Sequence, residues 1–264
     1  MNLRILFTLG TFFLLTMNII AQPGKMFIDT SAGIKSEDRM VFIGYPEDRR
    51  EESTVEPDSV IKVARISKST FLSLSKNAGP SIINDSTGIT RTKKSFTIKN
   101  KYFKKTFATD QVCECSTSDY LGFIAPLNVY VVHTTDMQNE VAFTDLIDYR
   151  TGKSFDVPSC ADEGPYDILL SPQYNTLLTY SNSDFEAGDC CIHLLKIRKN
   201  PTGQRYTMKV SLMLSFNRVN IQQLVWVNEK CFVMEVTERD IVEPNANYDY
   251  GKKRKYFMKV NLLK

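Results

Sequence analysis

The sequence has little of the residues on which catalysis usually depends. Its 264 residues include two histidines and one tryptophan. It has no G-x-S-x-G elbow, no H-E-x-x-H helix, no P-loop and no G-x-G-x-x-G fingerprint, which are the signatures of serine hydrolases, zinc proteases and nucleotide-binding proteins. We therefore expect a protein that has no catalytic residues and binds no cofactor and no metal.

The chain also has little excess of positive over negative charge. The formal net charge of the whole chain is +3, and nucleic-acid binding needs a concentrated basic surface. The basic clusters at residues 91–94 and 252–255 are short and stand beside turn residues or alternating apolar residues. We interpret them as solvated strand faces and loop tips, and we expect no nucleic-acid partner.

Long hydrophobic runs are absent after the first 21 residues. The chain opens with Arg4, an apolar run over residues 5–20 and Ala21 followed by Gln22, which is the pattern of a secretory signal peptide. The run is shorter than the roughly 20 residues that a membrane-spanning helix needs. We expect cleavage after Ala21 and export to the periplasm or the extracellular space, with no transmembrane segment in the mature chain. An uncleaved anchor is the alternative.

The second half of the chain is a series of short apolar runs separated by turn residues. Such runs, rich in Val, Ile, Leu, Tyr and Phe, are typical of antiparallel all-β structure. They occur at residues 128–133, 141–148, 166–170, 176–180, 190–197, 206–214, 223–227, 230–236 and 256–263. No helical period of useful length interrupts them.

The order of these turns resembles the blades of β-propellers of the WD40 or TolB-like type. "DYRTGKSFDVP" is followed by "YDILLSPQYNTLLTY", a long strand and "LVWVNEKCFVMEV". The resemblance covers about residues 120–263 and places about three blade-like units, whereas propellers have about four to eight. It implies a partial propeller or stacked antiparallel sheets, in a propeller-like domain over residues 111–264.

Residues 22–110 are more polar and less regular. Residues 46–59 are charged and hold two prolines, so we expect an exposed loop. Residues 69–79 predict a short helix closed by Gly79, and residues 94–103 alternate like a strand. We expect this α+β region to pack on the β domain.

The six cysteines favour disulfides, because their count is even and the chain is expected to be exported. They are Cys113, Cys115, Cys160, Cys190, Cys191 and Cys231. In a strand, Cys190 and Cys191 point to opposite faces, so one metal ion cannot use both sulfurs. We expect Cys160 to pair with one of these two cysteines. A mixture of thiols and disulfides, or a redox or metal role, is the alternative.

Only thin signals of chemistry remain. His133 is expected to end its strand and to be followed by a loop with Thr134, Thr135 and Asp136, where a carboxylate could orient it as a base. The segment 181–190 gathers Asp184, Glu186 and Asp189. Oxygen ligands of this kind suit a hard cation, but a solvated hairpin tip is the simpler interpretation.

The resulting expectation is an exported, non-catalytic binding protein. Its partner would be a protein or glycan in the cell envelope or outside the cell. The tyrosine-rich segment 245–257 supplies the amphipathic rings that interfaces favour, so Tyr248, Tyr250 and Tyr256 are the candidate binding residues. One alternative is a hydrolase that uses a loop histidine and carboxylates. Another is an inhibitor or immunity-type protein that neutralises an envelope enzyme.

Overall fold

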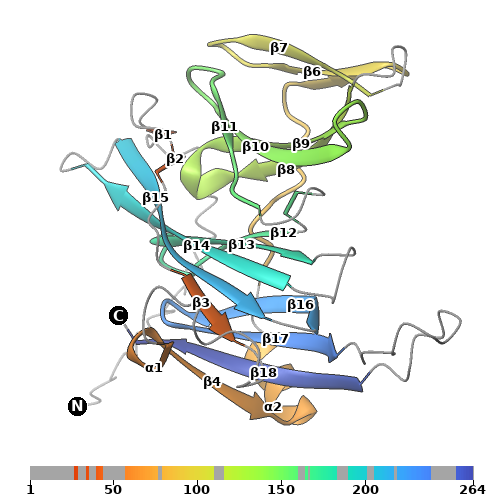
Figure 1. Ribbon diagram of the computed structural model, residues 1–264. Helices are drawn as coiled ribbons and strands as arrows, with labels where there is room; N and C mark the ends of the chain where they lie inside the picture. The colour runs from red at the N-terminus through yellow and green to blue at the C-terminus, as the bar shows by residue number, and fades with distance from the viewer. Residues whose placement is uncertain are drawn as a thin grey trace, which may run out of the picture.

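The described part of the chain is an all-β protein built from four stacked sheets (Figure 1). The computed structural model describes residues 27–28, 34–35, 40–43, 57–76, 79–109, 116–159, 164–165, 167–182, 190–200, 205–216, 219–238 and 254–263. The predicted fold class, all-β with stacked antiparallel sheets, is confirmed. The propeller resemblance stays a prediction.

Two sheets form the upper part of the stack in Figure 1. Sheet 1 consists of β5 (Ile89–Arg91), β6 (Ser95–Lys99) and β7 (Lys104–Ala108), and sheet 2 of β8 (Ser116–Ile124), β9 (Val129–Asp136), β10 (Val141–Asp148) and β11 (Ser154–Asp156). Both are antiparallel, and each pairs strands in chain order. The 3-10 helix η2 (Ala125–Leu127) joins β8 to β9.

The other two sheets combine consecutive strands with strands from the start of the chain. Sheet 3 holds β12 (Asp167–Leu170), β13 (Thr176–Asn182), β14 (Cys190–Lys199) and β15 (Arg205–Phe216), and β1 (Phe27–Ile28), β2 (Ile34–Lys35) and β3 (Met40–Ile43) pair with β15 in parallel. Sheet 4 holds β16 (Val219–Asn228), β17 (Cys231–Glu238), β18 (Arg254–Leu262) and β4 (Ile61–Ile66). The helices α1 (Pro57–Val60) and α2 (Lys68–Ser75) flank β4.

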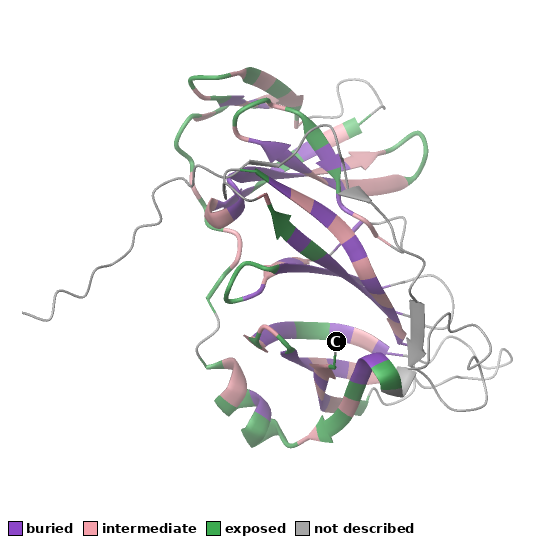
Figure 2. Ribbon diagram, turned by 90° about the vertical axis from the view of Figure 1, so that its left-hand side faces the viewer, coloured by how far each residue is buried: buried purple, intermediate pink, exposed green. Residues whose placement is uncertain are grey.

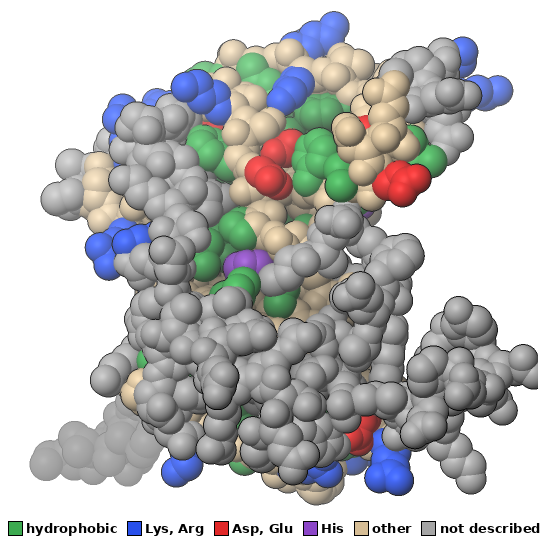
Figure 3. All heavy atoms as spheres, in the orientation of Figure 1, with side chains coloured by type: hydrophobic (Ala, Val, Ile, Leu, Met, Phe, Trp, Pro, Cys, Tyr) green, Lys and Arg blue, Asp and Glu red, His purple; other side chains and the backbone are tan. Residues whose placement is uncertain are grey.

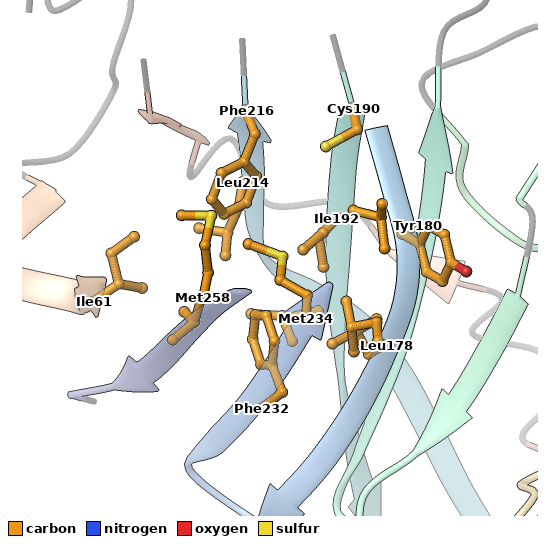
Figure 4. Packing of buried hydrophobic residues seen from close by; sticks show 14 of the residues in the cluster. Ile61, Leu178, Tyr180, Cys190, Ile192, Leu214, Phe216, Phe232, Met234 and Met258 are labelled. Atoms are coloured by element: carbon orange, nitrogen blue, oxygen red, sulfur yellow. The ribbon is translucent and has the colours of Figure 1, made fainter. Parts of the chain in front are cut away.

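The cores lie between neighbouring sheets. Sheets 3 and 4 share the largest cluster, which includes Leu178, Ile192, Phe232 and Met234 (Figure 4). A second cluster lies between sheets 2 and 3, and a third, rich in aromatic rings, between sheets 1 and 2. Sheets 2 and 3 are therefore covered on both faces, and Figure 2 shows buried residues concentrated in these middle layers. Strands covered on both faces are expected to be buried at successive positions, and all of β13 and the first six residues of β14 are buried, although β13 holds threonine, serine and asparagine as well as apolar residues.

The predicted strands are present with small shifts at their ends. The run at 141–148 is β10, and those at 176–180 and 190–197 are the first parts of β13 and β14. The predicted helix is α2, which begins after the N-cap Ser67, whose hydroxyl accepts from the Thr70 N–H, and ends at Ser75 rather than at Gly79.

The prediction of one strand over residues 94–103 is wrong. β6 ends at Lys99, and the Asn100 Oδ1 accepts from the backbone N–H groups of Tyr102 and Phe103 at 2.8 and 3.0 Å. An asparagine side chain that bonds the backbone two and three residues later forms a turn. This turn leads into β7, which lies beyond the predicted strand and was missed by sequence analysis.

Within the described residues, no helix is long and apolar enough to cross a membrane. The signal-peptide prediction over residues 1–21 falls outside the described residues. The loop predicted over residues 46–59 is described only at residues 57–59, where it is wrong, because these residues begin helix α1.

Candidate functional site

A groove of about 1050 Å³ runs beside β16. It lies between sheet 4, helix α2, the end of β12 and the turn that follows β12. We call it the β16 groove. Its lining is formed by residues 73–74, 79–81, 83, 125–126, 169–172, 174 and 223–227.

The groove follows the edge of a strand rather than one face of a sheet. It is lined by five consecutive residues, from Gln223 to Val227, although successive side chains of a strand point to opposite faces. Leu224 and Trp226 pack into the core between sheets 3 and 4, whereas Val225 and Val227 pack toward α2. A surface that reaches both sets of side chains must run along the strand edge, and β16 is the terminal strand of its sheet.

One wall of the groove is a turn held rigidly in place. Glu229, in the turn between β16 and β17, accepts hydrogen bonds from the Ser171 hydroxyl at 3.0 Å and from the Gln173 N–H. The Ser171 Oγ in turn accepts from the N–H groups of Asn175 and Thr176 at 3.2 and 3.0 Å. The two bonds to Glu229 fix the turn to sheet 4, and the two bonds to the Ser171 Oγ hold the shape of the turn itself.

The same turn presents an exposed aromatic ring. Tyr174 has a φ of 62°, in the left-handed region, and its side chain is 43% exposed. A tyrosine at positive φ is strained, and such strain persists only where the surrounding structure enforces it. Ile83, also 43% exposed, lies on the groove as well. Exposed apolar side chains gathered on a concave surface are typical of binding sites.

The described lining contains no Asp, Glu, Lys, Arg, His or Cys, although 24% of the chain is charged. General acid–base or nucleophilic catalysis would need such groups. The groove can therefore bind an uncharged or apolar segment, but its described walls offer no acid or base for chemistry.

His133 lies elsewhere, and its predicted place was wrong. β9 continues through Thr134 and Thr135 to Asp136, so His133 is an interior strand residue rather than the end of a strand before a loop. The predicted loop fails because Thr is a good strand former and the turn comes only at residues 137–140.

The contacts of His133 lie within sheet 2. Its Nδ1 is 3.0 Å from the Thr144 Oγ1, and Asp119 stands opposite it on β8. Burial lowers the pKa of His133, and the nearby Asp119 carboxylate offsets part of this effect. The half-buried histidine faces the interface between sheets 2 and 3. In Figure 3, hydrophobic side chains stand beside the histidine surface that is visible on this face, and Lys and Arg side chains lie in its upper, left and lower parts.

The adjacent residues Cys190 and Cys191 lie on opposite faces of β14, and His193 lies on the same face as Cys191. Cys190 points into the core between sheets 3 and 4 together with Ile192, whereas Cys191 and His193 face sheet 2 (Figure 4). The predicted division of the two cysteines between opposite faces is confirmed. Cys190 and Cys231 are buried thiols, and within the described residues no group of three or more His, Cys, Asp or Glu side chains could hold a metal ion.

The other candidate residues are only partly placed. Tyr256 lies in β18, half-buried against the core of sheets 3 and 4, with the Arg65 guanidinium 4.4 Å from the centre of its ring. Tyr248, Tyr250, Cys113, Cys115, Cys160, Asp184, Glu186 and Asp189 lie outside the described residues.

Comparisons of the chain with protein-family models, with curated proteins and with solved structures found no match. The functional interpretation therefore rests on the geometry of the groove. Sequence analysis noted the elements that form it, the Ser171-Pro172 turn and the run with Trp226, but it missed that these two segments meet. The two segments lie far apart in the sequence, and no local pattern of residues predicts that they are in contact.

Proposed function

We propose that the protein is an exported, non-catalytic binding protein that takes an uncharged, apolar segment of a partner protein into the β16 groove. The observation that carries this proposal is the groove itself: about 1050 Å³ with described walls that hold no charged side chain. Burying a charge without a partner costs several kcal/mol, so an uncharged wall selects an uncharged segment. Its size is at the upper end of the 300–1,000 Å³ that is usual for ligand sites.

The energy for binding would come from aromatic and aliphatic anchors. Tyr174 and Ile83 are each 43% exposed in the free protein, so burial of the exposed part contributes somewhat less than half of the roughly 1.5–3 kcal/mol that full burial of such a side chain gives. Trp226, whose Nε1 donates to the Leu169 carbonyl at 3.1 Å, forms a fixed part of the wall. A rigid, preformed wall lowers the entropic cost of association.

The two alternatives stand differently. A hydrolase with a loop histidine gains no support, because His133 is an interior strand residue that faces another sheet. An inhibitor or immunity-type protein would use the same binding groove, so it differs from this proposal in the identity of the partner. The predicted anchors Tyr248 and Tyr250 remain a prediction, because both lie outside the described residues.

The experiment compares capture of a partner from native extract by wild type and by groove variants. Tyr174→Gly removes the ring and relieves the positive φ, so the fold should be at least as stable. Ile83→Ser removes the second anchor. We expect each variant to reduce capture of a stoichiometric partner at least tenfold.

Two matched controls have similar exposure away from the groove. Leu121, 46% exposed on β8, and Met137, 47% exposed in the turn after β9, do not line it. Leu121→Ser and Met137→Ser should leave capture unchanged. If the groove variants capture the partner as well as wild type does, the β16 groove is not the binding site.

A further inference from the structure

We infer that the partner segment binds as an added β-strand that pairs with the backbone of β16. This inference rests on the proposed function and specifies how the groove would recognise its ligand. Strand addition to an exposed sheet edge gives affinity through main-chain hydrogen bonds, and specificity comes from the alternate side chains.

The geometry of β16 provides a regular stretch for pairing. β16 pairs with β17 on one side only, and its register shifts after Ile221 and after Trp226. Between these irregularities, residues 223–226 pair with β17 without interruption. In an antiparallel pair every second residue bonds to the neighbouring strand, so the alternate residues of this stretch direct their N–H and C=O groups toward the groove.

One end of this edge is already capped by a side chain. At Ile221, just before the groove, the Asn182 amide bonds both backbone groups: its Nδ2 donates to the Ile221 carbonyl at 3.0 Å, and its Oδ1 accepts from the Ile221 N–H at 2.8 Å. Within the part of the chain that the structure describes, no side chain bonds to the backbone of residues 223–227. The open stretch of β16 coincides with the groove.

The second strand that lines the groove is not open in this way. β12 is the terminal strand of sheet 3, but its Leu170 N–H donates to the Ser81 Oγ at 2.6 Å and its Leu169 carbonyl accepts from Trp226. Unpaired edges attract other chains, and here only the β16 edge is left available. A strand that enters the groove would therefore pair with β16 rather than with β12.

The chemistry of the walls defines the segment. It is extended, uncharged over about four residues, and carries apolar side chains that contact Tyr174 and Ile83. Pairing of β16 with a second copy of this chain is a different outcome, which the experiment below distinguishes from an added partner strand.

The experiment selects displayed random twelve-residue peptides on immobilised wild-type protein, with counter-selection on the Tyr174→Gly variant. The selected peptide is then synthesised with single backbone N-methyl groups at successive positions. N-methylation removes one N–H donor and adds bulk at the strand edge. We expect a period of two: methylation at every second residue weakens binding at least tenfold, and methylation at the residues between them changes it less than threefold.

The outcomes separate this inference from the proposed function. Peptides that depend on Tyr174 but tolerate N-methylation at every position would overturn strand addition and leave the apolar groove as the site. Failure to select any peptide that depends on Tyr174 would overturn both. A stable dimer of the peptide-free protein that Gln223→Lys dissociates would show that β16 pairs with a second copy, which contradicts an added partner strand.

Discussion

The side chain of Asn182 on β13 bonds the backbone of Ile221 on β16 in the way that a neighbouring strand would. Its amide makes two hydrogen bonds to the Ile221 backbone, at 2.8 and 3.0 Å, and the side chain is buried. The contact closes one end of the β16 edge, and it joins sheet 3 to sheet 4 across their shared core.

Asn182→Ala should therefore destabilise the protein by about 2–3 kcal/mol, because both Ile221 backbone groups lose a partner in a buried site. Urea denaturation measures this loss. Asn139→Ala, which removes an amide from the exposed turn after β9, should cost less than about 0.5 kcal/mol. Equal effects of the two substitutions would show that the Asn182 contact contributes nothing.

Cys191, rather than Cys190, is predicted to form a disulfide, with Cys160 as its expected partner. Ser181 stands opposite Cys191 on β13, and the Ser159 and Ser181 hydroxyls are 2.7 Å apart. This contact brings the chain to the Cys191 face one residue before Cys160. Closing a loop of about 30 residues should stabilise by about 3–4 kcal/mol on the chain-entropy model.

Peptide mapping by mass spectrometry without reduction tests this pairing. Cys190→Ser should retain the disulfide, and Cys191→Ser should lose it. A linked Cys190, or six thiols in protein taken from its own compartment, would refute the assignment.

His193 should make stability depend on pH below neutrality. Burial lowers its pKa to about 4, whereas the unfolded value is about 6.5. As pH falls below 6.5, the unfolded chain binds a proton that the folded chain does not, so stability is lost down to about pH 4.

The measurement compares wild type with His193→Gln. The free energy of unfolding of wild type should fall by about 2 kcal/mol more than that of the variant between pH 7 and pH 4.5. The difference between the two proteins matters because burial also raises the pKa of Asp145, Asp156 and Asp167, which opposes the loss in both. Parallel pH profiles would show that the pKa of His193 is the same in the folded and the unfolded chain, which contradicts the lowering by burial.

The sequence predicted the positions of the strands better than it predicted the groove. Period-two and continuous apolar runs located β9, β10, β13, β14 and β15, because these strands are buried and their composition is dictated by the core. β8 was missed, since Ser116, Ser118 and Asp119 dilute its apolar pattern. The pairing of β4 with β18 joins residues about 200 apart, and no local pattern encodes such a contact.

The groove shows the same limit. The turn at Ser171 and the turn at Glu229 were each predicted from local composition, but the hydrogen bonds between them arise only when sheets 3 and 4 stack. The candidate His133 was misjudged for a related reason: the threonines after it were taken as a loop, although the core of sheets 2 and 3 extends the strand past them.

The central claim, that the uncharged edge of β16 is the binding surface, is tested most directly by two neighbouring glutamines. Gln222 and Gln223 are both exposed, but only Gln223 lines the groove. A lysine on an edge strand is a common natural block to strand addition. Peptide selection run in parallel on wild type, Gln222→Lys and Gln223→Lys should enrich the same uncharged peptides on the first two proteins and reduce them at least tenfold on Gln223→Lys. Equal enrichment on all three proteins would contradict the account.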